Sequence, residues 1–172
     1  LIGAVYNGYI LVKKLKRDEE NKRDIQLRLL QAQINPHFLY NTLDAIVWLT
    51  ESGEYDDAID MVANLSVFFK IALSKGKDVI TLKEEIRHTR SYLEIQKARY
   101  KDILDYSINI SESVENEEVH KLTIQPLVEN ALYHGIKEKR GKGKIEVSVY
   151  EEKNDIVIKV EDNGVGISSE KL

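Results

Sequence analysis

Apolar residues recur every three or four positions over the first half of the chain, which is the period of an α-helix. Residues 9–51 contain no glycine and a single proline, Pro36. Two neighbouring stripes run through this stretch: Leu27, Leu30, Ile34, His37 and Asn41 form one, and Leu29, Ala32, Pro36, Leu39, Leu43 and Ile46 form the other. Two adjacent stripes predict one long helix that buries a wide face, as helices do in bundles.

A second helix is predicted after "ESGEYDD", where Gly53 supplies a turn. Its apolar stripe consists of Ala58, Met61, Val62, Leu65, Phe68, Phe69 and Ala72. The two helices form a predicted hairpin, and "SKGKD" at 74–78 is the linker to the rest of the chain. Because two helices bury little surface alone, we expect a homodimer in which two hairpins make a four-helix bundle.

The second half of the chain alternates between helical and strand periods. The predicted elements are a helix over 82–100, a strand over 104–110, a helix within 122–136, and strands over 144–152 and 155–162. The helix within 122–136 begins near Pro126, a residue well tolerated at a first helical position. Lys153 and Asn154 join the last two strands as a hairpin. The second half is therefore predicted to be α+β with an antiparallel sheet.

The composition is that of a folded protein, with 42% hydrophobic and 31% charged residues among 172. A net charge of −4 gives no general attraction for nucleic acid, so we expect no nucleic-acid partner. The absence of cysteine excludes disulfides and thiolate metal sites. No apolar run is long enough to span a membrane. The start, "LIGAVYNGYILVKKLKR", lacks methionine and begins mid-pattern, so we interpret it as internal to a longer chain and not as a signal peptide.

Two stretches in the second half could bind a ligand. In "EDNGVGI", Asp162 could accept a hydrogen bond from an exocyclic amine, while Gly164 and Gly166 let the backbone approach the ligand. In "QPLVENALYHG", Glu129 and Asn130 offer oxygen ligands of the kind that suit Mg²⁺, with His134 one turn later. Each has an ordinary alternative: a simple turn for the first, and an amphipathic helix capped at Gly135 for the second.

The third stretch, "QINPHFLYN", places Pro36 and His37 inside the long predicted helix. A lone histidine on a helix is more often structural than nucleophilic, and the other histidines show no metal-ligand spacing with it. Proline frees the carbonyl of Ala32 and bends a helix, so we hypothesise that the His37 turn is a hinge. The alternative is a plain helix boundary.

These three stretches, "LQAQINPHFLYNTL", "LTIQPLVENALYHG" and "VEDNGVGI", occur in the order found in sensor histidine kinases, and the first closely resembles the phosphoacceptor helix of the LytS/YesM type. The segment "ITLKEEI…YLEIQKARY" resembles that family's connecting helix, and the similarity covers about residues 16–167. The resemblance implies three parts: the end of a HAMP-like signalling helix over 1–15, a dimerisation and histidine phosphotransfer hairpin over 16–78, and a GHKL-type α/β sandwich ATP-binding domain over 79–172. This last domain would be incomplete, without a lid or second glycine box, so the chain alone is expected to bind ATP poorly and to be inactive.

The resemblance also assigns roles in the phosphotransfer helix. His37 would attack the γ-phosphate of ATP and store the phosphoryl group, and Asn41 would hydrogen-bond that group or position a water. Many other histidine kinases carry an acidic residue where Phe38 stands here. A general base must therefore come from elsewhere, or His37 must react already neutral.

In the ATP-binding domain, the resemblance assigns a Mg²⁺-binding role to Asn130, with Glu129 as its indirect neighbour. His134 would lie close to the phosphates, and Lys137 would substitute for a lysine that relatives often carry where Tyr133 stands. The adenine base would be read by Asp162, in a pocket opened by Gly164 and Gly166.

The implied function is that of the cytoplasmic portion of a two-component sensor histidine kinase, on the cytoplasmic side of a membrane. Its expected partners are a second copy, an upstream transmembrane sensor segment and the receiver domain of a response regulator; ATP and Mg²⁺ are the expected cofactors. One alternative is a dimeric signalling scaffold with a non-functional or truncated ATP site. A related ATPase is disfavoured, because Pro126 stands where such enzymes carry a water-activating glutamate.

Overall fold

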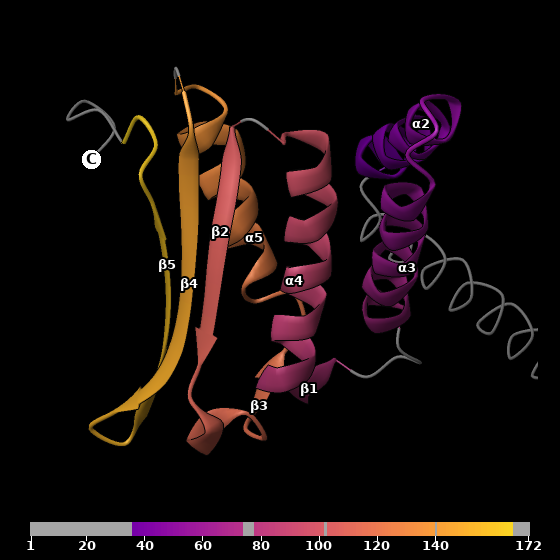
Figure 1. The fold of residues 1–172 in the computed structure, drawn as a ribbon. Helices are drawn as coiled ribbons and strands as arrows, with labels where there is room; N and C mark the ends of the chain where they lie inside the picture. The colour runs from indigo at the N-terminus through magenta and orange to yellow at the C-terminus, as the bar shows by residue number, and fades with distance from the viewer. Residues whose placement is uncertain (1–35, 74–77, 102, 140, 167–172) are drawn as a thin grey trace, which may run out of the picture. The chain divides into compact units, whose positions relative to one another are not determined.

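The computed structural model describes residues 36–73, 78–101, 103–139 and 141–166 (Figure 1). The predicted helix before Pro36, the HAMP-like segment, the carbonyl of Ala32 and linker residues 74–77 lie outside the described residues. The chain divides into two compact units, Leu1–Tyr40 and Asn41–Leu172. The first described residues of helix α2 belong to the first unit, and everything after Tyr40 belongs to the second.

Helices α2 (Pro36–Glu51) and α3 (Tyr55–Ala72) are joined by a tight turn, as predicted. Gly53 has φ +79°, and the backbone N–H of Glu54 donates to the carbonyl of Leu49 at 2.9 Å. The close packing of α3, however, is with α4 and not with α2. The turn is therefore confirmed, while the hairpin does not bury its two helices against each other within the second unit.

Helix α4 (Leu82–Arg99) begins with a complete capping box. The Thr81 side chain accepts from the N–H of Glu84 at 3.2 Å, and the Thr81 N–H donates to the Glu84 carboxylate at 3.1 Å. Just before it, the short strand β1 (Val79–Thr81) pairs antiparallel with β3 (Glu118–His120). The helix predicted over 82–100 is thereby confirmed.

A three-stranded sheet forms the other layer, with the order β2 (Leu104–Ile110), β4 (Gly143–Glu152) and β5 (Asp155–Asp162). The β4–β5 hairpin is confirmed, since Lys153 and Asn154 take the left-handed conformation with φ 51° and 73°. The prediction of a wholly antiparallel sheet is wrong, because β2 pairs parallel with β4. The chain crosses over between them through residues 111–142, which returns β4 in the direction of β2.

The crossover carries a short 3-10 turn (Glu112–Val114), β3, α5 (Gln125–Asn130) and a π-helical turn, η2 (Ala131–Ile136). Pro126 stands in the first turn of α5, as predicted. Helices α4 and α5 lie on the same face of the sheet in Figure 1, and the alternate residues Ile145, Val147 and Val149 of β4 are buried. Among the described helices, none is long and apolar enough to cross a membrane.

Candidate functional site

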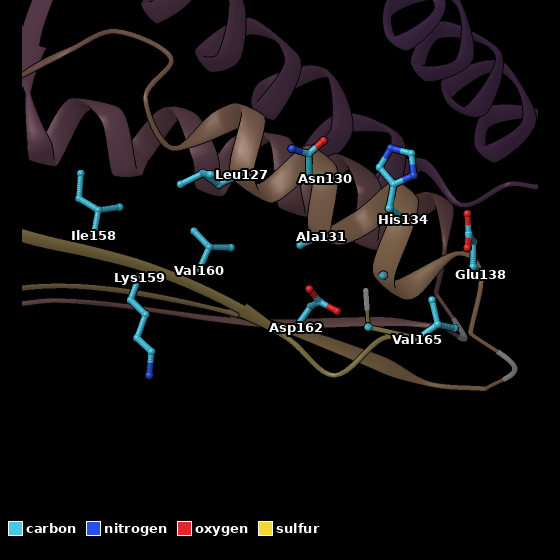
Figure 2. Close-up of a pocket in the computed structure, with 12 residues that line it drawn as sticks. Leu127, Asn130, Ala131, His134, Glu138, Ile158, Lys159, Val160, Asp162 and Val165 are labelled. Carbon is cyan, nitrogen blue, oxygen red and sulfur yellow. The ribbon is translucent and has the colours of Figure 1, made fainter. Parts of the chain in front are cut away.

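A cleft of about 1070 Å³ lies between the α5–η2 segment and β5 (Figure 2). Its helical wall consists of Leu127, Asn130, Ala131, His134, Gly135 and Glu138, and its other wall consists of Ile158, Lys159, Val160, Asp162, Val165 and Gly166. The lining is mixed, because five of these twelve residues are apolar, five are polar or charged and two are glycines. A concave site that combines apolar surface with polar groups can bind and orient a small molecule.

Asn130 and His134 lie on one wall of the cleft, because residues four apart share a helix face. The segment after Asn130 is a π-helical turn: the N–H of Lys137 donates to the carbonyl of Leu132 at 2.9 Å, a bond that spans five residues instead of four. Such single π-turns are frequent at functional sites.

The opposite wall ends in a carboxylate held by its own loop. Asp162, the last residue of β5, accepts the N–H of Gly164 on Oδ1 at 2.8 Å. The loop also contacts η2, since the Val165 N–H donates to the carbonyl of Gly135 at 3.3 Å. Asp162 is therefore fixed relative to the helical wall of the cleft.

Two glycines make this contact possible. A Cβ at Gly135 would collide with the Asp162 carboxylate, and a Cβ at Gly164 would collide with the Gly135 backbone. The alternative of a helix capped at Gly135 is wrong, because η2 continues to Ile136. Gly135 is needed for the close approach of the loop and not for ending the helix.

The predicted ATP-site residues are only partly brought together. Asn130, His134, Asp162 and Gly166 line one cleft, and Gly164 packs against the backbone of Gly135, which also lines it. Glu129 lies outside the cleft lining and accepts a hydrogen bond from Gln125 Nε2 at 2.9 Å.

Lys137 also lies outside the cleft lining. Its Nζ is 4.4 Å from the ring centre of Tyr133 and 4.8 Å from that of Tyr100. These are cation–π distances, so the lysine side chain is engaged by aromatic faces.

The predicted phosphotransfer residues lie on α2. His37 is exposed in its first turn, and Asn41 follows four residues later, so the two share a helix face.

Sequence reasoning missed most of the apolar lining, and it also missed Glu138. Ile158 and Val160 alternate with their neighbours toward Asp162, so the strand period could have placed all three on one face of β5. Nothing comparable in the sequence identifies Glu138.

Two protein families match the chain in succession. Residues 25–104 match the family described as histidine kinase, and residues 119–172 match the histidine kinase-, DNA gyrase B-, and HSP90-like ATPases. The sensor histidine kinase YesM of Bacillus subtilis is 35% identical over 150 residues, which cover 87% of this chain and 26% of YesM.

Two further relatives are also sensor histidine kinases. The sensor histidine kinase BtsS of Escherichia coli K12 is 32% identical, over 94% of this chain and 29% of BtsS. The sensor histidine kinase/phosphatase LytS of Staphylococcus aureus is 32% identical, over 99% of this chain and 30% of LytS. The chain belongs to the sensor histidine kinases of the LytS, YesM and BtsS type. It spans about 26 to 30% of the length of these relatives.

The two family matches cover different elements of this sensor histidine kinase chain. The histidine kinase match contains α2, α3 and α4, and the ATPase match begins in β3 and contains both walls of the cleft. The cleft therefore lies wholly within the region that the ATPase family covers.

Proposed function

We propose that this chain is the cytoplasmic portion of a two-component sensor histidine kinase, which phosphorylates His37 with ATP and passes the phosphoryl group to an aspartate of a response regulator. The observation that carries the proposal is that Asn130, His134 and Asp162 line one cleft within the ATPase-matched region. The phosphoacceptor candidate lies within the histidine kinase match, exposed on α2.

The cleft residues fit a nucleotide. Asp162 is a carboxylate beside apolar walls, suited to accept a hydrogen bond from the adenine amine. Gly135 and Gly164 keep side-chain atoms out of this part of the site. The Asn130 amide oxygen suits Mg²⁺, which takes its remaining oxygens from phosphate and water, with Glu129 as an indirect neighbour. His134 would lie beside the phosphates, while Lys137 would have to leave the Tyr100 and Tyr133 rings to reach them.

In the proposed reaction, a neutral imidazole nitrogen of His37 attacks the γ-phosphorus. A P–N bond forms, the bond to the bridging oxygen breaks, and ADP leaves with the electron pair. The imidazole proton passes to a base other than residue 38, which is phenylalanine. Asn41, one turn further along α2, would hydrogen-bond the bound phosphoryl group or position a water. An aspartate of a receiver domain then takes that group from the histidine.

The proposal includes a homodimer and an upstream membrane sensor joined through a HAMP-like helix, which would put this chain on the cytoplasmic side of a membrane. The support for a dimer is the exposed apolar surface of α2 and α3, which comprises Leu43, Val47, Trp48, Tyr55, Ile59 and Val62. On each helix most of these side chains are three or four residues apart and share a face, and exposed apolar faces of this kind favour a protein interface.

The test uses the full-length protein that carries this chain, incubated with γ-labelled Mg-ATP. We expect acid-labile, alkali-stable label in the wild type, none in His37→Gln, and strongly reduced label in Asp162→Asn. His120→Gln is the matched control, because His120 is an exposed histidine outside the cleft. Label of this kind that survives in His37→Gln would contradict the assignment.

The second candidate is a dimeric signalling scaffold whose nucleotide site is non-functional. One observation favours it: β5, which forms one wall of the cleft, is an edge strand of the described sheet. Thermal unfolding of the 172-residue chain with and without Mg-ATP separates the two. The scaffold predicts no shift, whereas a shift of several degrees that Asp162→Asn removes would contradict it.

A further inference from the structure

Glu85 is a buried carboxylate on α4, outside the cleft. Its side chain is 1% exposed, yet it accepts two backbone N–H groups: that of Ile124 on Oε1 at 2.9 Å and that of Leu122 on Oε2 at 3.1 Å. Removing a carboxylate from water is costly unless hydrogen bonds compensate. Burial raises the pKa of Glu85, and the N–H groups of Ile124 and Leu122 oppose that rise.

The segment that Glu85 holds is strained and lacks a cap of its own. Leu122 has φ 61°, a left-handed conformation that is unfavourable for a non-glycine residue and persists only where its surroundings fix it. Ile124 is the N-cap residue of α5 and offers no side-chain oxygen to the helix. The carboxylate of Glu85 accepts the N–H of this N-cap residue from another helix, a role that the N3 side chain of a capping box normally fills from within its own helix.

The helical run that starts at this point carries one wall of the cleft. Asn130 and His134 follow within three turns, and Gly135 meets the Asp162 loop at a distance that leaves no space for a Cβ. A shift of the start of α5 would be transmitted along the run, because a helix moves as a rigid rod over so few turns. It would separate the two walls or press them together.

We propose that Glu85 is a positioning residue for the nucleotide cleft: by holding the N–H groups of Leu122 and Ile124, it fixes α5–η2, and with it Asn130 and His134, relative to Asp162. This rests on the proposed function only in naming the ligand as a nucleotide. The alternative is that Glu85 stabilises the fold without any particular effect on the cleft.

The test compares Glu85→Gln with Leu93→Ala in the full-length protein. Glutamine keeps the shape of glutamate but replaces one acceptor oxygen with an NH₂ that faces a backbone N–H. Leu93 is a fully buried residue on the same helix, eight residues from Glu85, and its truncation destabilises the core without removing a hydrogen bond to residues 121–125. The first readout is Mg-ATP affinity, measured by displacement of a fluorescent ATP analogue at a temperature where both variants are folded.

We expect Glu85→Gln to weaken Mg-ATP binding about tenfold, the effect of losing one hydrogen bond to a charged group, and Leu93→Ala to change it little. The second readout is hydrogen–deuterium exchange without nucleotide, in which a peptide spanning 121–125 should exchange faster only in Glu85→Gln. Equal affinity losses in the two variants, or unchanged affinity in Glu85→Gln, would overturn the positioning role.

Two further outcomes are covered. If Glu85→Gln does not fold, Glu85→Asp replaces it, because aspartate keeps the charge but is too short to reach both N–H groups. Mg-ATP affinity and exchange of 121–125 are then measured for Glu85→Asp, and the same results would overturn the positioning role. If the wild-type protein does not bind Mg-ATP, the proposed function fails. In that case unchanged exchange of 121–125 in the Glu85 variant also overturns the loop-holding role, while faster exchange supports it.

Discussion

Helices α2 and α3 expose several large apolar side chains, whereas the α4–sheet region buries most of its apolar side chains. Trp48 on α2 is 59% exposed and Ile59 on α3 is 64% exposed, whereas Leu93 on α4 and Ile145 on β4 are 0% exposed. The α+β region buries its apolar side chains between α4, α5 and one face of the sheet, and α3 packs on α4 as well. The helical region leaves apolar surface for which the described chain provides no cover, and this difference is the physical basis of the proposed dimer.

The largest effect should come from a pair of truncations, one in each region. Ile145→Ala opens a cavity in the sheet core and should lower the free energy of unfolding by about 2 to 5 kcal/mol. Trp48→Ala removes a larger side chain but should change monomer stability by only about 0.5 kcal/mol, because that side chain is already in water. Urea denaturation measures both.

Trp48→Ala also tests the dimer, with a different core variant as its control. Trp48→Ala should weaken self-association in sedimentation experiments, while a mild core variant, Val147→Ala, should not. The comparison fails if Trp48→Ala destabilises the monomer as much as Ile145→Ala. It also fails if the wild-type chain is monomeric at tens of micromolar.

A second effect concerns His88, where the two regions touch. His88 on α4 is 0% exposed and stacks on Phe68 of α3, with ring centres 4.3 Å apart and planes 19° from parallel. Neither ring nitrogen has a hydrogen-bond partner in the described structure. Burial, with a smaller contribution from the charge of Lys121, lowers the pKa of His88 from 6.5 to about 4.

The lowered pKa gives stability a definite pH dependence. Between pH 6.5 and 4 the unfolded chain binds a proton at this histidine and the folded chain does not. The free energy of unfolding is therefore unaffected by this histidine above pH 6.5. It decreases as the pH falls from 6.5 toward 4, by at most about 3 kcal/mol. The urea midpoint should fall more between pH 7 and pH 4.5 in the wild type than in His88→Phe, which keeps the aromatic stack. Equal pH dependence in both proteins would show that His88 does not titrate across folding.

Local features of the fold could be predicted from the sequence. Alternation gave the strands over 144–152 and 155–162, and Lys153–Asn154 gave their turn, because these depend only on neighbouring residues. The parallel pairing of β2 with β4 could not be predicted in this way. Alternation is the same for either direction, and the direction is set by the long crossover over 111–142.

The candidate site shows the same limit. The motifs identified Asn130, His134 and Asp162, whose roles remain predictions, and the structure places all three in one cleft. Glu129 lies outside the cleft lining because adjacent residues on a helix point in directions about 100° apart. Glu84 and Glu85 illustrate this equally well: one caps α4 at the surface and the other is buried against the loop before α5.

A third effect compares glycines from the two regions. Gly164→Ala would place a Cβ against the Gly135 backbone and should cost about 1 to 3 kcal/mol, with loss of nucleotide binding because Asp162 is displaced. Gly53→Ala has open space around it but a left-handed backbone, and it should cost about 1 to 2 kcal/mol without affecting the cleft. Asparagine, which tolerates the left-handed conformation, should rescue position 53 and not position 164. Rescue at both positions would mean that space is not limiting at Gly164.

The smallest effect should come from the ion pairs between the two regions. Lys101, just after α4, lies 2.8 Å from both Glu54 and Asp57 at the start of α3, and these carboxylates raise the pKa of the lysine. All three side chains are exposed, so water and salt weaken the attraction. Lys101→Ala should lower the thermal midpoint only slightly at low salt and not at all in 1 M NaCl. Lys83→Ala, which breaks a 2.7 Å pair with Glu115 inside the α+β region, should behave alike. If Lys101→Ala instead destabilises the protein as much as Phe68→Ala does, the contact between α3 and α4 is electrostatic and not apolar.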